Sequence, residues 1–495
     1  MGQPMEQALR TCVLALAVGR ELDLDDATLS DTYYLALLRF VGCTSDAHEA
    51  AAASGGDEIA DRALVAPLVM GTVGEFLPHY LPRFAAGRPL PIRLVLLARV
   101  LAQGADRAKR TIAVHCQVAE MLAARLDIRP GVAQCVAALF ERWDGRGIPG
   151  ELSGDAIPIP ARLVAVARDV DVFHRMGGWA LVVAVLRRRR AAAYDPAAVD
   201  VLLTHGERWL NELGAESVWD IALAAEPRPP VLVGRVRLEG LLRALADFAD
   251  LKSPYTLGRS SGVAHLAEGA ARCAGLSADE VRDVRHAALV HDLGRTGIPN
   301  GIWDKPGRLS PSEWERVRLH PYLSERILAQ PSALADLAPL AGAHHERIDG
   351  SGYHRGSPSR FLPMTARILA AADAYQAMTQ DRPHRPALSP TAAAAALRGE
   401  ADAGRLDQGA VRAVLEAVGL RTPAARHAWP AGLTEREVEV LRLISCGQPN
   451  RVVAQRLGLS TKTVGRHVEN LYAKIGVSSR AAAALFAMEH DLLGA

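Results

Sequence analysis

The stretch HHERIDGSGYHRG, residues 344–356, decides the fold because the chain carries a second version of it. LFERWDGRGIPGE, residues 139–151, lies 205 residues earlier and has Glu, Arg, Asp and two Gly at the same places, but its histidines are gone. A repeat on this scale is the signature of a duplicated structural unit. The sequence therefore predicts one fold present twice, once with residues able to bind a metal and once without them.

The repetition extends on both sides of these stretches. ARLVAVARDVD begins 205 residues before ARILAAADAYQ, and the same spacing separates His115 from His320. Nearer the N-terminus, LALLRFVGCT at Leu35 matches AALVHDLGRT at Ala287 with a spacing of 252 residues. The first copy therefore has an insertion of 47 residues, which we place between residues 44 and 101.

Domain boundaries follow from the repeat. We predict homologous domains at residues 1–225 and 232–422, followed by a smaller unit at residues 429–495. EPRPP, residues 226–230, separates the first two domains because prolines lack a backbone donor and disfavour helix in the preceding residue. Apolar residues recur at helical spacing in both large domains, without period-two alternation. The predicted fold class is all-α.

The composition fits folded, helical domains. Apolar residues make up 49% of the 495 residues, enough to bury several cores. The net charge of +2 means that any affinity for nucleic acid must come from a local patch. Six scattered cysteines without a C-x-x-C pair indicate reduced thiols. Neither a signal peptide nor a membrane span is recognisable, so we expect a soluble, cytoplasmic protein.

The C-terminal unit predicts four short helices. Thr434 and Glu437 form a capping box at the start of the first helix, and Gly447 ends it. The second helix covers residues 450–457, Ser460 caps the third, and Ser478 is the expected cap of the fourth. A short helix, a tight turn and a polar helix make the helix-turn-helix arrangement, whose second helix enters the major groove of DNA.

The third of these helices has one apolar and one polar face. Val464, Val468, Leu471 and Ile475 recur at packing spacing. On the other face, arginine and asparagine can reach base edges and lysines can reach phosphates. The predicted DNA-binding residues are Lys462, Thr463, Arg466, His467, Asn470 and Lys474. With TEREVEVL at its start and SR near its end, the unit resembles the C-terminal domain of LuxR/NarL-type regulators. That resemblance implies a homodimer paired through the fourth helix.

Six residues of the second large domain are typical metal ligands. They are the adjacent His291 and Asp292, His320, the adjacent His344 and His345, and Asp373. Imidazole with carboxylate suits Fe, Mn or Zn better than Mg or Ca. A carboxylate can bridge two metals that activate water for attack on a phosphodiester. The sequence therefore predicts a metal centre in this domain.

HDLGRTGIPN, WDKPGRLS, RLHP and HHERIDGSGYHRG together resemble the HD-GYP group of the HD phosphohydrolase superfamily, from about residue 253 to 415. The resemblance implies hydrolysis of cyclic dinucleotides, chiefly cyclic di-GMP, at a two- or three-metal centre, with Fe or Mn favoured over Zn. Asp292 would bridge the metals, His291 and Asp373 would serve one of them, and His320, His344 and His345 would serve the other. The implied catalytic residues are Asp292 and Arg295, and the implied substrate loop contains Asp349, Gly350, Gly352 and Tyr353.

Three positions depart from that group. Arg259, 32 residues before the HD pair, stands where the group has its leading metal histidine, and a guanidinium cannot ligate a cation. Arg295 replaces a lysine but keeps a charge that could clamp a phosphate, and His354 replaces the proline of the GYP signature. We therefore expect the first metal to be weakened or lost, which leaves one ion.

The first copy has lost almost all of the ligands. The replacements are Arg39 and Phe40 for the HD pair, Leu139 and Phe140 for the HH pair, Arg168 for Asp373, and Gln7 for Arg259, while only His115 remains. We expect no metal pair here and a pocket turned into core. Its role would be structural, dimer-forming or ligand-sensing. The run RRRR, residues 187–190, is expected to be a solvated helix face in preference to a phosphate patch.

Two functional hypotheses follow. In the first, the protein is a DNA-binding transcription regulator whose second domain binds a metal, a nucleotide or both as a regulatory input. In the second, it is an active metal-dependent cyclic-dinucleotide phosphodiesterase coupled to DNA binding. Arg259 favours the first hypothesis.

Overall fold

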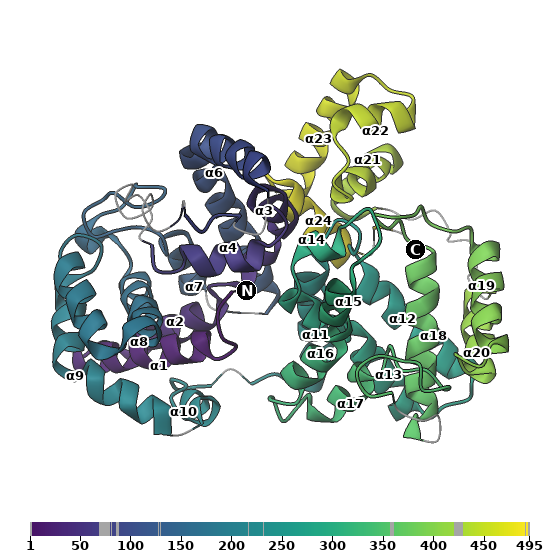
Figure 1. Cartoon of the computed structure of the whole chain (residues 1–495), viewed down its shortest axis with the longest axis horizontal. Coiled ribbons are helices and arrows are strands. Elements are labelled where there is room, and N and C mark those ends of the chain that lie inside the picture. The colour runs from purple at the N-terminus through teal and green to yellow at the C-terminus, as the bar shows by residue number, and fades with distance from the viewer. Residues whose placement is uncertain are drawn as a thin grey trace. The chain divides into compact units, whose positions relative to one another are not determined.

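The computed structural model describes residues 2–68, 80, 82–85, 89–126, 128, 130–215, 217–230, 232–356, 361–419, 429–490 and 492–493. Over these ranges the chain is helical, and the only β-structure is two isolated bridges. The all-α prediction is confirmed (Figure 1). All six cysteines are free, as predicted, and no helix among the described residues is long and apolar enough to cross a membrane.

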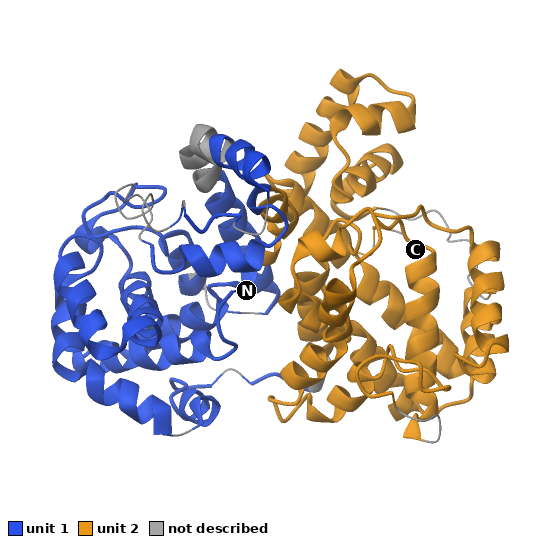
Figure 2. Cartoon of the chain, in the orientation of Figure 1, with its two compact units in different colours: residues 1–43, 53–234 blue, residues 44–52, 235–495 orange. Residues whose placement is uncertain are grey.

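The chain divides into two compact units (Figure 2). Unit 1 comprises residues 1–43 and 53–234, and unit 2 comprises residues 44–52 and 235–495. The predicted domain boundaries at 225, 232 and 422 stay predictions, although the division after residue 234 lies near EPRPP. The segment at residues 44–52 belongs to the predicted insertion of the first copy.

Unit 1 is built on two helices, α1 (Gln7–Glu21) and α2 (Asp26–Leu38), which pack against each other and against the long α8 (Ile159–Arg189). α8 contains a kink at Gly177 and Gly178, where the backbone leaves helical geometry. The other helices containing residues of this unit are α3 (Ala47–Ser54), α4 (Glu58–Val65), α6 (Leu90–Arg125), α7 (Pro130–Ala137), α9 (Pro196–Ala215) and α10 (Val218–Ala224). Leu14, Leu16 and Leu163 are among the fully buried core residues.

Unit 2 repeats this arrangement. α12 (Arg259–Cys273) packs against α13 (Ala278–Val290) and α18 (Met364–Met378) around a second core. The neighbouring helices are α11 (Arg235–Asp250), α14 (Asn300–Trp303), α15 (Pro311–Arg318), α16 (His320–Leu328), α17 (Ala338–Gly342), α19 (Pro390–Asp402) and α20 (Gln408–Gly419). A 3₁₀ turn, η3 (Leu293–Gly297), follows α13 directly.

The structure supports the predicted duplication. α1 and α12 have the same length, as do α2 and α13, and each pair is offset by 252 residues. α8 and α18 start 205 residues apart. A Cβ on Gly42 would collide with the carbonyl of His115, and a Cβ on Gly294 would collide with the carbonyl of His320. Both copies therefore need a glycine at the same close approach. The glycines are 252 residues apart and the histidines 205 residues apart, so the insertion of the first copy lies between Gly42 and His115.

The residues common to the two repeated stretches hold a loop. Glu346 accepts from the backbone N–H of Arg355, and Glu141 accepts from that of Gly150 at the equivalent place. Asp349 likewise caps its own loop through the N–H of Ser351, at 2.9 Å. A Cβ on Gly352 would lie 2.6 Å from the Cα of Glu346, so only glycine fits there. The residues shared by the two copies are structural ones.

The C-terminal segment has the four predicted helices, α21 (Glu435–Ser445), α22 (Asn450–Leu457), α23 (Thr461–Ile475) and α24 (Arg480–Glu489). The capping box of Thr434 and Glu437 is present, and Ser460 caps α23. The expected cap Ser478 is wrong by one residue, because the hydroxyl of Ser479 accepts from the N–H of Ala482. Gly458 ends α22 with a φ of 65°, which makes the tight turn of the helix-turn-helix.

Candidate metal centre and nucleic-acid interface

Four helices or their ends bring the predicted ligands together. His291 ends α13 and Asp292 follows it, while His320 is the first residue of α16. His344 and His345 follow α17. Asp373 lies in the middle of α18. All six lie in one cluster, because contacts between neighbouring members link the whole set.

Three of the histidines are held in one tautomer. The Nδ1 atoms of His291, His320 and His344 each lie 2.6 Å from a backbone carbonyl, those of Ala288, Val317 and Ala341 respectively. A carbonyl can only accept, so Nδ1 carries a hydrogen and Nε2 is the nitrogen left to take a proton or a metal. This backbone anchoring is the usual support of a metal-binding histidine.

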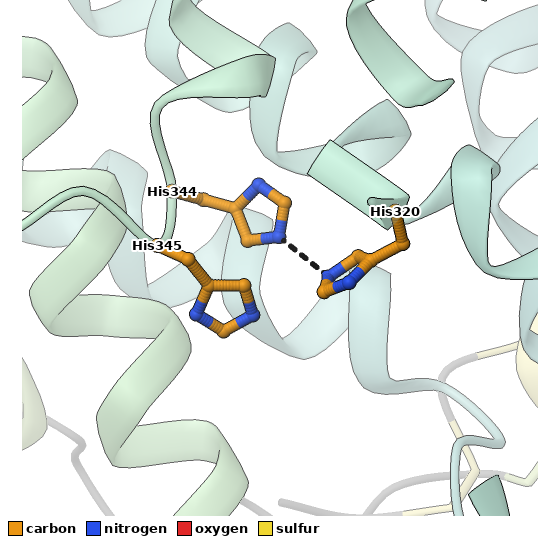
Figure 3. A group of neighbouring side chains, drawn as sticks. All are labelled: His320, His344 and His345. Atoms are coloured by element: carbon orange, nitrogen blue, oxygen red, sulfur yellow. Dashed lines mark hydrogen bonds between the residues drawn. The ribbon is translucent and has the colours of Figure 1, made fainter. Parts of the chain in front are cut away.

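The Nε2 atoms of His320 and His344 face each other at 3.1 Å (Figure 3). Two neutral acceptor nitrogens repel at this distance unless a cation or a proton lies between them. Metal–nitrogen bonds of about 2.1 Å place neighbouring ligands roughly 3.0–3.4 Å apart. Asp292 Oδ1 lies 3.3 Å from His320 Nε2 and 3.6 Å from His344 Nε2, and it has no hydrogen-bond partner among the described residues. These three atoms therefore fit one divalent metal.

His345 completes this side of the cluster less tightly. Its ring lies 4.4 Å from that of His344 and 5.0 Å from that of His320, centroid to centroid. Its Nδ1 atom lies 3.9 Å from Asp373 Oδ2. His320, His344 and His345 form a set of possible ligand atoms within 4.8 Å of one another, and so do His291, Asp292 and His344.

Arg259 occupies the other side of the cluster. Its Nε donates to Asp292 Oδ2 at 3.2 Å, and its Nη2 donates to Asp373 Oδ1. His291 Nε2 lies 3.5 Å and 3.3 Å from the same two carboxylate oxygens. These four side chains are at most 3% exposed. The guanidinium therefore lies against the donor atoms that were expected to serve the first metal.

Charge and burial set the protonation of these groups. Burial opposes the ionisation of Asp373, but Arg259 and His291 outweigh it and hold the pKa well below its ordinary value. Burial likewise opposes ionisation of Asp292, but His291, Arg295 and His320 keep its pKa well below the ordinary value. Burial and repulsion from His291 and His320 lower the pKa of His344 to about 3. At neutral pH the cluster thus has ionised carboxylates and a neutral His344, the forms that bind metals.

Comparison with known proteins agrees with this geometry. Residues 89–197 and 243–409, together more than half of the chain, match the model of the HD domain family. The chain belongs to the HD-domain family. Residues 431–487 match the model of the bacterial regulatory proteins of the luxR family. The two resemblances expected from the sequence, an HD-GYP-type domain and a LuxR-type domain, are confirmed.

Relatives of this HD protein are cyclic-dinucleotide phosphodiesterases. The 3'3'-cGAMP-specific phosphodiesterase 3 of Vibrio cholerae is 31% identical over 390 residues, which cover 78% of this chain and 85% of the relative. The cyclic di-GMP phosphodiesterase response regulator RpfG of Xanthomonas campestris is 35% identical over 187 residues, 37% of this chain and 50% of the relative. The crystal structure of V-cGAP3, a cyclic GMP-AMP specific phosphodiesterase of V. cholerae, matches 85% of this chain and 94% of its own with a TM-score of 0.58 and 28% identity.

The second HD domain also positions arginines around the cluster. The Arg295 guanidinium stacks on the ring of Trp303 at 3.8 Å, and its Nη1 lies 3.5 Å from Asp292 Oδ2. Arg382 was not predicted, since no motif marks the loop after α18. Burial and the nearby charges of Arg259 and Arg295 lower its pKa well below the ordinary value, which places it beside them. The sequence feature that could have indicated Arg382 is its position nine residues after the predicted ligand Asp373.

The predicted substrate loop of this HD domain divides into two parts. Asp349 is exposed, and Gly350 adopts a φ of 80°, so these residues shape the loop backbone. Tyr353 instead reaches the cluster, because its ring lies 4.3 Å from that of His345 at an angle of 32°. Of the four loop residues, Tyr353 is the one in contact with a candidate ligand.

The LuxR-type domain presents the predicted polar face on α23. Lys462, Thr463, Arg466 and Asn470 are exposed, and His467 is partly buried. Val464 and Leu471 on the opposite face are fully buried, as the apolar spacing predicted. Lys474 donates to Glu437 Oε2 at 2.7 Å and to the carbonyl of Gly432. Lys474 therefore also holds the capping box of α21 in place.

The first HD copy agrees with its predicted apolar replacements and departs from prediction at one arginine. Leu139 is buried in the core and Phe140 packs against it, as predicted. Arg189, from the RRRR run, was expected on a solvated face but is 4% exposed and donates to Asp169, Tyr194 and the carbonyl of Pro67. The expectation is wrong for this residue and holds for the exposed Arg187, Arg188 and Arg190.

Proposed function

We propose that this protein is a transcription regulator whose second HD domain senses a cyclic dinucleotide at a centre with one divalent metal ion. The observation that carries this proposal is the position of Arg259 between Asp292 and Asp373. A guanidinium such as that of Arg259 is positively charged at neutral pH and has no lone pair to give a metal. It pairs with both carboxylates and excludes a cation from the first metal position.

The remaining ligands suit one ion. His320, His344 and Asp292 would hold it, with His345 close by. This mixture of imidazole and carboxylate suits Fe, Mn or Zn better than Mg or Ca, and of these we propose Fe or Mn. When bound, the ion would supply a Lewis acid that attracts phosphate oxygens and lowers the pKa of water. The backbone carbonyls behind the histidines keep Nε2 directed at that position.

The arginines suit a phosphate-bearing ligand. Arg259 Nη1 is buried and has no hydrogen-bond partner among the described residues, so it can donate to a phosphate oxygen. Arg295 and Arg382 add two more positive charges close to Arg259. Because relatives are phosphodiesterases for 3'3'-cGAMP and cyclic di-GMP, we assign the ligand to the cyclic dinucleotides.

An active phosphodiesterase is the second candidate. The intact ligands on the His320 side and the 31% identity to a cGAMP-specific phosphodiesterase favour it. Under this alternative one ion and Arg259 together would stabilise the charge that two ions stabilise elsewhere.

Metal content tests the proposal. Protein prepared anaerobically with Mn²⁺ or Fe²⁺ should contain one ion per chain by mass spectrometry of the metal, and Arg259→His should raise this to two. The same samples should bind 3'3'-cGAMP or cyclic di-GMP by calorimetry without hydrolysing them. Two ions in the wild type with turnover that Asp292→Ala abolishes would establish the enzyme in place of the sensor.

We propose DNA as the partner of the LuxR-type domain, contacted by the exposed face of α23, and a homodimer as the binding form. Residues Ala482–Met488 of α24 are all buried, because this helix packs against α11 as well as α21 and α23. The helix expected to pair two copies is therefore covered within unit 2. Ligand binding in the HD domain would release it, which couples the centre to dimerisation.

Binding to an operator isolated by selection from random DNA tests this part. Arg466→Ala with Asn470→Ala should reduce sequence-specific binding at least tenfold, since each base contact contributes roughly 1–3 kcal/mol. Glu469→Ala on the same helix is the control. Unchanged specificity in the double variant would remove α23 from the interface.

A further inference from the structure

Unit 1 has a cluster of arginines where its lost metal ligands would lie. Arg39 follows the end of α2 as His291 follows the end of α13, and Arg168 has the place on α8 that Asp373 has on α18. The matched glycine contacts of Gly42 and Gly294 show that the two sites are built alike. In unit 2 these positions belong to a cation-binding cluster, whereas in unit 1 they are themselves cations.

Among the residues that the structure describes, Asp169 is the carboxylate that pairs with this cluster. Asp169 accepts from Arg168 and from Arg189 Nη1, and it also accepts from the hydroxyl of Tyr194. The guanidinium carbon of Arg39 lies 4.5 Å from the centroid of the Phe40 ring. Its Nε and Nη1 atoms are buried and have no hydrogen-bond partner among the residues that the structure describes. Three guanidinium groups and one carboxylate leave an excess of positive charge.

Such an excess is costly inside a protein. A buried charged donor that makes no hydrogen bond loses its hydration without compensation. Burial and repulsion from Arg168 lower the pKa of Arg39 to about 9, so the group still carries its charge at neutral pH. An anion between Arg39 and Arg168 would satisfy the donors and balance the charge.

We propose that unit 1 binds a phosphate group through Arg39 and Arg168, at the positions that correspond to His291 and Asp373 in the second copy. Guanidinium groups recognise the tetrahedral oxygens of phosphate through paired N–H donors. Neither arginine can supply the Lewis acid or the activated water of a metal centre. The site therefore binds its ligand without hydrolysing it, as an input distinct from the centre of unit 2.

The phosphate has two possible sources, a nucleotide or free inorganic phosphate. Hydrogen exchange of the full chain, followed by mass spectrometry, separates them because it localises protection. We expect one of three probes, inorganic phosphate, GMP or cyclic di-GMP, to slow exchange in peptides covering residues 36–43 and 165–172. Protection by inorganic phosphate alone would identify a phosphate sensor, and protection by a nucleotide at lower concentration would identify a nucleotide sensor.

Arg39→Met provides the discriminating variant. It should raise the melting temperature of unit 1 in phosphate-free and sulfate-free buffer, because it removes a charged group whose buried Nε and Nη1 have no hydrogen-bond partner among the described residues. It should also lower the affinity for the protecting probe about tenfold to a hundredfold. Arg190→Met is the control, since Arg190 pairs with Asp200 on the exposed surface.

Two results would overturn the proposal. The first is a lower melting temperature of Arg39→Met in phosphate-free and sulfate-free buffer together with undiminished protection by the probes, which would make Arg39 a structural residue. The second is the absence of protection in wild-type unit 1 with all three probes. Wild-type exchange decides the question even where Arg39→Met does not fold.

Discussion

Replacing Arg259 by methionine should destabilise the metal-free protein strongly. The substitution keeps an unbranched side chain but removes the charge that pairs with Asp292 and Asp373. Both carboxylates are at most 3% exposed, so they cannot recover hydration. Breaking a buried pair in this way costs about 3–5 kcal/mol. For a domain of this size, about 2–4 °C per kcal/mol converts the loss to roughly 6–20 °C in melting temperature.

The measurement is thermal unfolding of the full chain in EDTA at neutral pH. Arg272→Met is the matched control on the same helix, because Arg272 is 68% exposed and pairs only with Glu268, so its loss should cost less than about 1 kcal/mol. The transition of the HD domain that contains Arg259 is identified by its response to Mn²⁺.

Adding Mn²⁺ extends this test. In Arg259→Met the oxygens of Asp292 and Asp373 and the Nε2 of His291 lose their competing cation, so a second ion can bind. At a concentration about 100 times its dissociation constant, that ion would restore about 2.7 kcal/mol. Two outcomes would refute the role assigned to Arg259. In the first, the melting temperature of the variant in EDTA lies within about 2 °C of that of wild type. In the second, Mn²⁺ raises the melting temperature of the variant no more than it raises that of wild type.

Three further predictions concern other parts of the chain. Burial raises the pKa of Asp250 to about 7, above its ordinary 3.8. The folded state therefore keeps a proton that the unfolded state loses, and the free energy of unfolding falls as pH rises from about 4 to 7. Asp250→Asn should flatten that part of the stability curve, measured by urea unfolding. Gly294→Ala should lower metal affinity at least tenfold in a titration, because its Cβ displaces the carbonyl of His320, whereas Gly307→Ala, with open space around it, should not. Lys474→Ala should lower the melting temperature of the LuxR-type domain, since it frees Glu437, while leaving sequence preference unchanged in a binding selection.

The helix boundaries of the LuxR-type domain were predictable because short-range chemistry sets them. The predicted range of α22 coincides with the observed one, and the capping box of Thr434 and Glu437 forms as expected. The error at Ser478 has the same origin. Two adjacent serines can both cap a helix, and the choice of Ser479 depends on how α24 packs.

The RRRR run shows where sequence reasoning stops. In a regular helix, the period of 3.6 residues would predict which of residues 187–190 point to solvent and which to the core. The kink at Gly177 and Gly178 changes the direction and phase of α8, so Arg189 turns inward to Asp169. The spacing to the HD pair likewise indicated the place of Arg259, but not which carboxylates it contacts. Such contacts depend on tertiary packing that no local pattern encodes.

The duplicated loop separates what the fold requires from what the chemistry requires. Glu141 and Glu346 make equivalent backbone contacts, and both copies keep the glycines of the loop, so a copy without histidines still folds. The ligand positions were free to change, and in both copies arginines now stand at them. A guanidinium keeps the positive charge that attracts phosphate and gives up the Lewis acidity that activates water. Under the two proposals, Arg39, Arg168 and Arg259 would move both HD copies in the same direction, from hydrolysis toward recognition of a phosphate.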